Sequence, residues 1–186
     1  MILSDSEIRQ NIENGSIIIS PFRDECLGSN SYDVHLGNAL GTYRESVLDC
    51  RTPNHLEITE IGDDGFLLQP GKLYLGVTEE FSSTIGLVPF LEGKSSTGRL
   101  GISVHVTAGK GDEGFANHWT LELSVIQPVR VYSGMPIAQL IFFRLSGAVT
   151  VSYADKASAK YSDVSTLPQA SAMWRNFTPV KEGETT

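Results

Sequence analysis

The densest group of side chains that could bind a ligand lies in the segment 91–99, LEGKSSTGR. Gly93 and Gly98 bracket a lysine, two serines and a threonine, and Arg99 follows directly. Amides, hydroxyls and cations in this arrangement can surround the oxygens of a phosphate chain. A polar turn between two strands has the same composition, so both interpretations stay open. A Walker A loop is excluded, because Val88 stands where that loop requires a glycine.

A glutamate in the segment 118–125, HWTLELSV, is the second candidate. Apolar and polar residues alternate there, which places Trp119 and Leu121 on one face of a strand and Glu122 on the other. A carboxylate that lines a pocket can transfer protons during catalysis. On a half-buried strand a glutamate more often faces solvent. The alternation by itself leaves both roles open for Glu122.

Between these two segments lies a glycine-rich loop, residues 105–115, HVTAGKGDEGF. Glycines allow a backbone to approach a ligand closely, and Asp112 could present its carboxylate there. A turn without any ligand explains the same glycines. The loop is therefore a further open candidate for ligand contact.

The histidines and cysteines do not indicate a catalytic zinc site. None of the four histidines has metal-ligand spacing. His55-Leu56-Glu57 matches the histidine and glutamate half of a zinc-deaminase signature. The paired-cysteine half is absent, because Cys26 and Cys50 both precede His55. We expect no zinc in this protein.

The composition restricts the classes of function. The chain has 22 acidic and 14 basic residues and a net charge of -8, which disfavours general binding to DNA or RNA. No run approaches the roughly 20 apolar residues of a membrane span, and no signal-peptide pattern is present. Two cysteines are too few for a disulfide framework. We expect a cytoplasmic protein with neither a membrane nor a nucleic acid as partner.

The elements that would position these candidates are mostly short strands. Ser4 and Glu7 form a capping-box pattern that begins a helix of about ten residues, which Asn14-Gly15 ends. Apolar or alternating runs then follow, separated by turn residues, as is typical of a β-barrel or sandwich. The expected strands are 17–19, 32–36, 66–68, 73–77, 86–91, 102–106, 119–125, 129–132, 137–143 and 149–153. Beyond Tyr153 we expect a polar tail that docks late or on a neighbouring subunit.

Taken in chain order, these segments resemble the dCTP deaminase and dUTPase superfamily from Met1 to about Ser171. The segment 120–123 is similar to the deaminase hallmark, whose glutamate plain dUTPases lack. The other matching segments are 1–5, MILSD; 29–37, SNSYDVHLG; 93–99, GKSSTGR; 107–115, TAGKGDEGF; and 136–142, PIAQLIF. The resemblance implies a mainly β, dUTPase-like distorted β-barrel or jelly-roll with a short N-terminal helix, assembled as a homotrimer. It implies one domain over 1–186, in which 154–186 is a tail that closes over the nucleotide.

The activity that the resemblance implies is zinc-independent hydrolysis of dCTP to dUTP and ammonia, which supplies precursors of dUMP and dTTP. Glu122 would transfer protons while a water held by Ser95 and the Ala108 carbonyl attacks C4 of cytosine. Arg99 would orient the base and support the glutamate. Partial burial suits this shuttle, because it raises the pKa of a carboxylate toward neutrality.

The family binds the triphosphate between subunits, together with Mg²⁺ that is held mainly by phosphate oxygens and has no direct protein ligand. A candidate inhibitor is dTTP. The nucleotide-binding residues implied are Lys94, Ser96, Asp112, Gln139, Tyr153, Lys160 and Gln169. Lys94 replaces a frequent arginine, Gly111 an apolar residue and Glu113 a usual proline. Gln169 takes the place of a glutamine that the family has closer to Lys160.

The sequence leaves the end product and the presence of catalysis open. One branch of the family also hydrolyses the nascent dUTP to dUMP and pyrophosphate, and its third motif commonly begins threonine-alanine-glycine, as residues 107–109 do. Asp112 would then help to place a second water at the α-phosphate, with magnesium offsetting the charge. A non-catalytic nucleotide-binding regulator and an unrelated β-barrel interaction module are also compatible with the pattern. Because Glu122 is present, we expect an enzyme. Its expected product is dUTP, with the dUMP-forming reaction as the alternative.

Overall fold

The N-terminal helix forms as the capping-box pattern predicts. The computed structural model describes residues 1–177, so the end of the predicted tail, 178–186, lies outside the described residues. Helix α1 (Asp5–Glu13) begins where the Ser4 N–H donates to Glu7 Oε2 at 3.1 Å and the Glu7 N–H donates to Ser4 Oγ at 3.4 Å. It ends before Gly15, whose φ of +79° suits a residue without a side chain.

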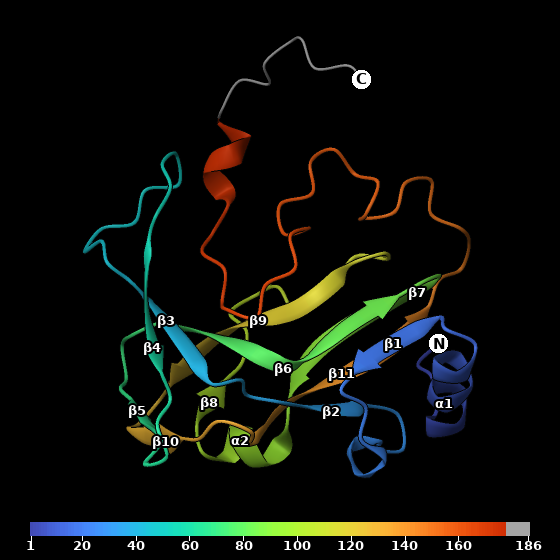
Figure 1. Cartoon of the computed structure of the whole chain (residues 1–186), viewed down its shortest axis with the longest axis horizontal. Coiled ribbons are helices and arrows are strands. Elements are labelled where there is room, and N and C mark those ends of the chain that lie inside the picture. The colour runs from blue at the N-terminus through green and yellow to red at the C-terminus, as the bar shows by residue number, and fades with distance from the viewer. Residues whose placement is uncertain (178–186) are drawn as a thin grey trace.

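The rest of the described chain is mainly β, which confirms the predicted fold class (Figure 1). The strands are β1 (Ile17–Ser20), β2 (Tyr32–His35), β3 (Ala39–Tyr43), β4 (Leu56–Glu60), β5 (Phe66–Leu68), β6 (Tyr74–Thr84), β7 (Leu87–Gly93), β8 (Ile102–Ser103), β9 (Ala116–Val125), β10 (Val129–Val131) and β11 (Pro136–Arg144). The other helical elements are η1 (Asp24–Cys26), α2 (Ser95–Arg99) and η2 (Met173–Asn176). None of the helices within residues 1–177 is long and apolar enough to cross a lipid bilayer.

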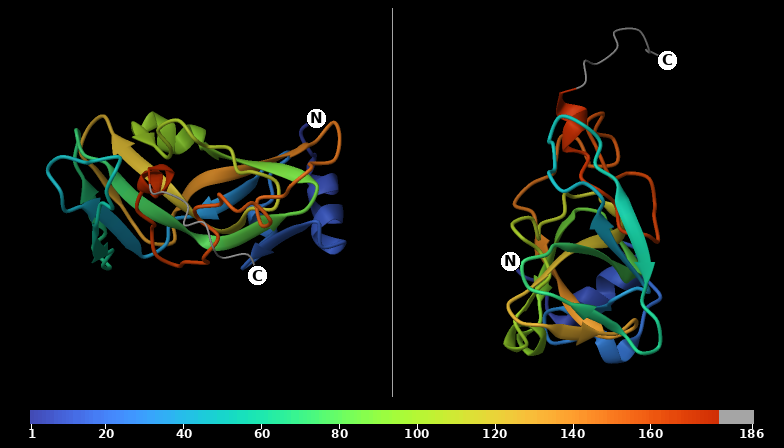
Figure 2. Two further views of the ribbon diagram at one scale, coloured as in Figure 1. Left: turned by 90° about the horizontal axis from the view of Figure 1, so that it is seen from above. Right: turned by 90° about the vertical axis from the view of Figure 1, so that its left-hand side faces the viewer.

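The strands form three sheets that share one apolar interior. The largest has the order β4-β3-β6-β9-β8, with β1 added to β6, and the others are β2-β11-β7 and β10-β5. Seen along the strands in Figure 2, right, the sheets close around a common interior. Leu121 and Leu123 of β9 and Leu140 and Phe142 of β11 are fully buried there. The core therefore draws on both larger sheets, as in a barrel or sandwich.

The alternation predicted for the 118–125 segment is confirmed. Strand β9 pairs antiparallel with β6, and Leu75 lies opposite Glu122. Buried and half-buried residues alternate along the whole of β9. Because Leu121 and Leu123 occupy the core, the period of two directs Glu122 away from it.

Several elements differ from the prediction: the short helices η1, α2 and η2 were not expected, and β6 extends beyond the expected strand 73–77. Residues 149–153 form no strand and instead lead into the tail. The expected strand 102–106 shortens to β8, and β3 and β4 are absent from the expected strands, although Leu56 and Ile58 of β4 alternate with polar residues. Strand β3 contains Gly41, whose missing side chain leaves room for Leu56 and Ile58 of β4. This fit depends on the partner strand, so propensity alone does not reveal it.

The tail docks on its own chain. The Asn117 side chain of β9 donates to the carbonyls of Tyr161 and Asp163, at 3.1 and 3.0 Å, and accepts from the Ser165 N–H at 3.0 Å. Further along, the Gln169 N–H donates to Thr120 Oγ1 at 3.1 Å. In Figure 1 this segment, in orange and red, lies along the upper side of the molecule above β9.

Replacing Asn117 with alanine should release the tail. Asn117 is 1% exposed, and its amide satisfies three tail groups that alanine would leave unpaired. We expect a loss of about 2 kcal/mol in the free energy of unfolding, since three hydrogen bonds are lost and each contributes about 0.5–1.5 kcal/mol. Denaturant titration and limited proteolysis of the 154–171 segment would measure it. Asn30→Ala, at an exposed position, is the control and should change neither the free energy of unfolding nor the proteolysis of the tail. Equal behaviour of the two variants would contradict the role of Asn117 in holding the tail.

Candidate active site

A cavity of about 610 Å³ lies between β9, the 105–115 loop and the tail. Its volume falls in the range of small-molecule sites. The residues that line it are Tyr43, Leu48, Leu73, Leu75, Val106, Thr107, Ala108, Lys110, Gly111, Asp112, Phe115, Asn117, His118, Trp119, Thr120, Glu122, Tyr153, Tyr161, Gln169 and Ser171. The predicted residues Glu122, Ala108, Asp112, Tyr153 and Gln169 are therefore brought together in one cavity.

Glu122 is held by the backbone of the neighbouring loop. The Val106 N–H donates to Glu122 Oε2 at 2.7 Å, and the Glu122 N–H donates to the Val104 carbonyl at 2.9 Å. Within residues 1–177 its other oxygen, Oε1, has no hydrogen-bond donor, and the side chain is half-buried. A carboxylate oriented through one oxygen, with the second oxygen available, can accept and return a proton. The setting of Glu122 thus differs from that of a fully solvated side chain.

The loop around Ala108 is shaped by two glycines that approach other backbone and side-chain atoms closely. A Cβ on Gly109 would lie 2.5 Å from the Leu91 carbonyl oxygen, so no larger residue fits. A Cβ on Gly111 would lie 2.7 Å from the Trp119 ring. Trp119 therefore fills the space that an apolar residue at position 111 would need, which explains this departure from the family pattern.

Glu113, which stands where the third motif of the family usually has a proline, connects the 105–115 loop to Gly86 and Tyr153. Its Oε1 accepts from the Gly86 N–H at 2.9 Å, and its carbonyl accepts from the Tyr153 N–H at 2.8 Å. The Tyr153 ring packs edge-on against Phe115, with centroids 5.5 Å apart. The start of the tail is therefore anchored on the 105–115 loop.

Asp112 lies between two lysines. Lys110 Nζ contacts Oδ1 at 2.6 Å, and Lys156 Nζ, from the tail, contacts Oδ2 at 3.2 Å. The hydrogen bond from Lys110, and after it the one from Lys156, lower the pKa of Asp112 against the opposing effect of partial burial. Asp112 is accordingly an anion at neutral pH.

The residues expected to bind phosphate lie elsewhere in the chain. Ser95, Ser96 and Arg99 are exposed on α2, which occupies the bottom of Figure 1 while the tail occupies the top. They do not line the cavity, and neither do Lys94 and Gln139. The structure thus divides the predicted site residues into two groups.

Within the α2 group, two side chains are held by neighbouring strands. Lys94 forms an ion pair with Asp33 of β2, and Gln139 Nε2 donates to the Gly93 carbonyl at 3.1 Å. Asp33 and Gln139 are paired residues across β2 and β11. Asp33 belongs to the predicted first motif, but the sequence assigned it no role.

One predicted residue, Lys160, lies outside the cavity, and several residues that line the cavity were not predicted. Lys160 is not a lining residue; its N–H donates to Tyr153 Oη at 3.2 Å. Thr120 shares the polar face of β9 with Glu122, so the alternation could have identified it. Tyr43 and Leu48 come from β3 and the loop after it, and nothing in the sequence places them beside Glu122.

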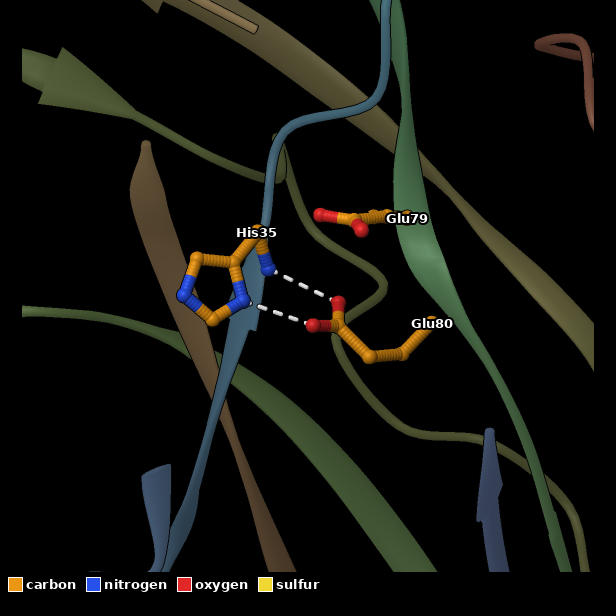
Figure 3. A group of neighbouring side chains, drawn as sticks. All are labelled: His35, Glu79 and Glu80. Carbon is orange, nitrogen blue, oxygen red and sulfur yellow. Dashed lines mark hydrogen bonds and ion pairs between the residues drawn. The ribbon is translucent and has the colours of Figure 1, made fainter. Parts of the chain in front are cut away.

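A separate cluster brings together His35, Glu79 and Glu80 (Figure 3). Glu80 is fully buried and accepts from the His35 N–H at 2.8 Å and from Nδ1 at 2.6 Å. Arg23 reaches both carboxylates, with Nη1 2.9 Å from Glu80 and Nη2 2.5 Å from Glu79. The guanidinium already supplies the positive charge that a metal ion would bring. The cluster is therefore a structural ion-pair network between β2, β6 and residue 23.

Comparison with known proteins identifies the family. Residues 2–145 match the profile of the dCTP deaminase-like family, and the chain belongs to that family. The proteins named "dCTP deaminase, dUMP-forming" from Clostridium beijerinckii and from Clostridium botulinum (strain Alaska E43) are each 46% identical to it over 177 residues, 95% of this chain and 99% of theirs. The predictions of the family and of a deaminating enzyme are thus confirmed.

A solved structure agrees on the fold. The crystal structure of 2'-deoxycytidine 5'-triphosphate deaminase from Agrobacterium tumefaciens superposes with a TM-score of 0.61 at 23% identity, covering 76% of this chain. The chain spans 47% of the length of that protein. At this identity the likeness concerns the fold alone.

The comparisons correct one expectation from the sequence. The prediction that dUTP is the end product is wrong, because the relatives that match nearly the whole chain are dUMP-forming. The alternative that we kept, a dUMP-forming reaction, agrees with these names. The segment 107–109, threonine-alanine-glycine, was the signal for this reaction.

Proposed function

We propose that this protein deaminates dCTP and then hydrolyses the resulting dUTP to dUMP and pyrophosphate in the same site. The observation that carries the proposal is that one cavity contains two carboxylates in different settings. Glu122 is bound by a backbone amide, and Asp112 is bound by two lysines. Two carboxylates with different partners can perform two different steps.

In the deamination step Glu122 moves the protons. Its free oxygen takes a proton from a water whose oxygen attacks C4 of the cytosine ring, with the Ala108 carbonyl and Ser95 orienting that water. Glu122 delivers this proton to N3 of the ring, then takes the proton of the hydroxyl group now on C4 and passes it to the exocyclic amine. The bond between C4 and the exocyclic nitrogen breaks, and ammonia leaves. A carbonyl remains at C4, which gives dUTP.

In the second step Asp112 orients another water toward the α-phosphorus. The water oxygen forms a bond to phosphorus, and the bond from that phosphorus to the oxygen bridging the α- and β-phosphates breaks. Pyrophosphate leaves with the electron pair, and the proton of the water passes through Asp112 to solvent. The lysines favour this step because they keep Asp112 in the form that accepts a hydrogen bond.

We also propose a homotrimer in which α2 of one subunit faces the cavity of the next. This is supported by the position of Ser95, Ser96 and Arg99, which are exposed and do not line the cavity of their own chain. Exposed apolar residues near these elements also suit an interface: Leu100 is 47% exposed and Val106 is 61% exposed. Lys94 and Gln139 would contact the triphosphate from the same neighbouring subunit.

Magnesium fits this site as a companion of the triphosphate. Among residues 1–177 the one trio of close histidine and carboxylate ligands is the Figure 3 cluster, which Arg23 fills. Phosphate oxygens would therefore hold the ion, which would neutralise part of the phosphate charge. Tyr153, Lys160 and Gln169 would contact the nucleotide from the tail. Competition by dTTP for this cavity stays a prediction.

Product analysis tests the proposed function directly. Purified protein with dCTP and magnesium should yield ammonia, dUMP and pyrophosphate without accumulating dUTP, and a zinc-selective chelator should have no effect. Chromatographic separation of the nucleotides over time is the measurement. Accumulation of dUTP as the final product would refute the second step, and absence of dCTP turnover would refute both.

Glu122→Gln should lose deamination while keeping assembly and nucleotide binding. The amide has a similar shape but cannot accept the proton of the attacking water. We expect ammonia release to fall about 10²- to 10⁴-fold, the range that general acid–base catalysis contributes. Calorimetric titration with dCTP provides the control for binding. Ammonia release at the unaltered rate would overturn the role of Glu122.

Mixed trimers test whether neighbouring subunits share a site. Glu122→Gln and Arg99→Ala subunits should each be inactive alone. After co-refolding, some interfaces would combine an intact Glu122 with an intact Arg99, so part of the activity should return. The ammonia release of mixtures, compared with that of each variant alone, is the measurement. If no mixture regains activity although hybrids form, the two residues act from the same chain.

A further inference from the structure

The carboxylate of Asp112 is divided between two lysines of different origin. Lys110 belongs to the same loop and contacts Oδ1, whereas Lys156 reaches Oδ2 from the tail, 44 residues along the chain. With both oxygens engaged, the orientation of the carboxylate is fixed from two sides. The tail is thus directly connected to the carboxylate that we assign to pyrophosphate release.

Lys156 is not what holds the tail in place. The tail is anchored by the Tyr153 N–H, by the Tyr153 ring on Phe115, and by the buried Asn117 amide. Lys156 and Asp112 are 47% and 38% exposed, and an exposed ion pair of this kind contributes only about 0–1 kcal/mol to stability. Its loss should leave the fold and the docked tail intact.

Glu122 depends on different contacts. Its orientation comes from the Val106 N–H and from the pairing of β9, neither of which involves a tail residue. The two carboxylates of the cavity can therefore be perturbed separately. The Lys156 contact acts on one of them alone.

We propose that Lys156 is a positioning residue for pyrophosphate release, through which the docked tail determines whether dUTP is hydrolysed before it leaves the site. The inference rests on the proposed function, and it adds a residue to which the family resemblance gave no role. Without Lys156, Asp112 Oδ2 is free to turn toward solvent or toward Lys110. The second water then loses its alignment with the α-phosphorus, while attack on C4 is unaffected.

Lys156→Met tests the proposal because it keeps most of the unbranched side chain and removes its charge. With dCTP as substrate, we expect ammonia release within about twofold of the unaltered protein, and dUTP to appear beside dUMP. With dUTP as substrate, kcat should fall about 10- to 100-fold at a similar KM, since a displacement of about 1 Å can cost about 10² in rate. Lys156→Arg should largely restore dUMP formation, because it returns a cation that can reach Oδ2.

Arg9→Met is the matched control. It removes a cation from another exposed ion pair, Arg9 with Asp24 at 2.7 Å, in which Arg9 is 49% exposed and lies on α1. We expect its products and rates to equal those of the unaltered protein.

The outcomes separate this inference from the proposed function. If the unaltered protein forms dUMP and Lys156→Met forms it with unchanged kcat, the positioning role is overturned and the proposed function stands. Equal losses of ammonia and dUMP would also overturn the inference, because they would place Lys156 in general substrate binding. If the unaltered protein releases dUTP alone, both proposals fail together.

Discussion

The antiparallel pairing of β6 with β9 is the constraint on which the rest of the site depends. Because side chains alternate along a strand, the burial of Leu121 and Leu123 in the core obliges Glu122 to face the cavity. A slip of one residue would exchange the two faces and bury the carboxylate without a partner. The same strand supplies Asn117, which holds the tail, so one register positions both Glu122 and the tail segment that lines the cavity.

The cavity gives each of its two carboxylates its own neighbours, which suits the two steps that we propose. Glu122 has a backbone amide on one oxygen and a free second oxygen, which suits a group that must gain and lose a proton. Asp112 has a cation on each oxygen, which lowers its pKa and favours the anionic form. A protein that uses both can carry a nucleotide through two hydrolytic steps without rearranging its backbone.

The ion-pair network around Glu80 connects β2, β6 and residue 23 through buried and half-buried charges. A fully buried carboxylate is costly unless it is paired and hydrogen-bonded, and Glu80 receives donors from His35 and Arg23. The set of one histidine and two glutamates, His35, Glu79 and Glu80, has the composition of a metal site. The Arg23 guanidinium pairs with both glutamates and supplies the positive charge that a metal ion would otherwise provide.

The sequence by itself determined the helix at residues 5–13, most of the strands, the outward direction of Glu122 and, through its motifs, the family. These are local properties: capping, period-two alternation and short patterns of residue types. Only the tertiary structure decided that Tyr43 and Leu48 enclose the cavity, that Lys156 meets Asp112, and that Arg23 fills the Glu80 cluster. Each of these contacts joins segments that are distant in the chain, so its existence depends on register and packing and not on any local pattern of residues.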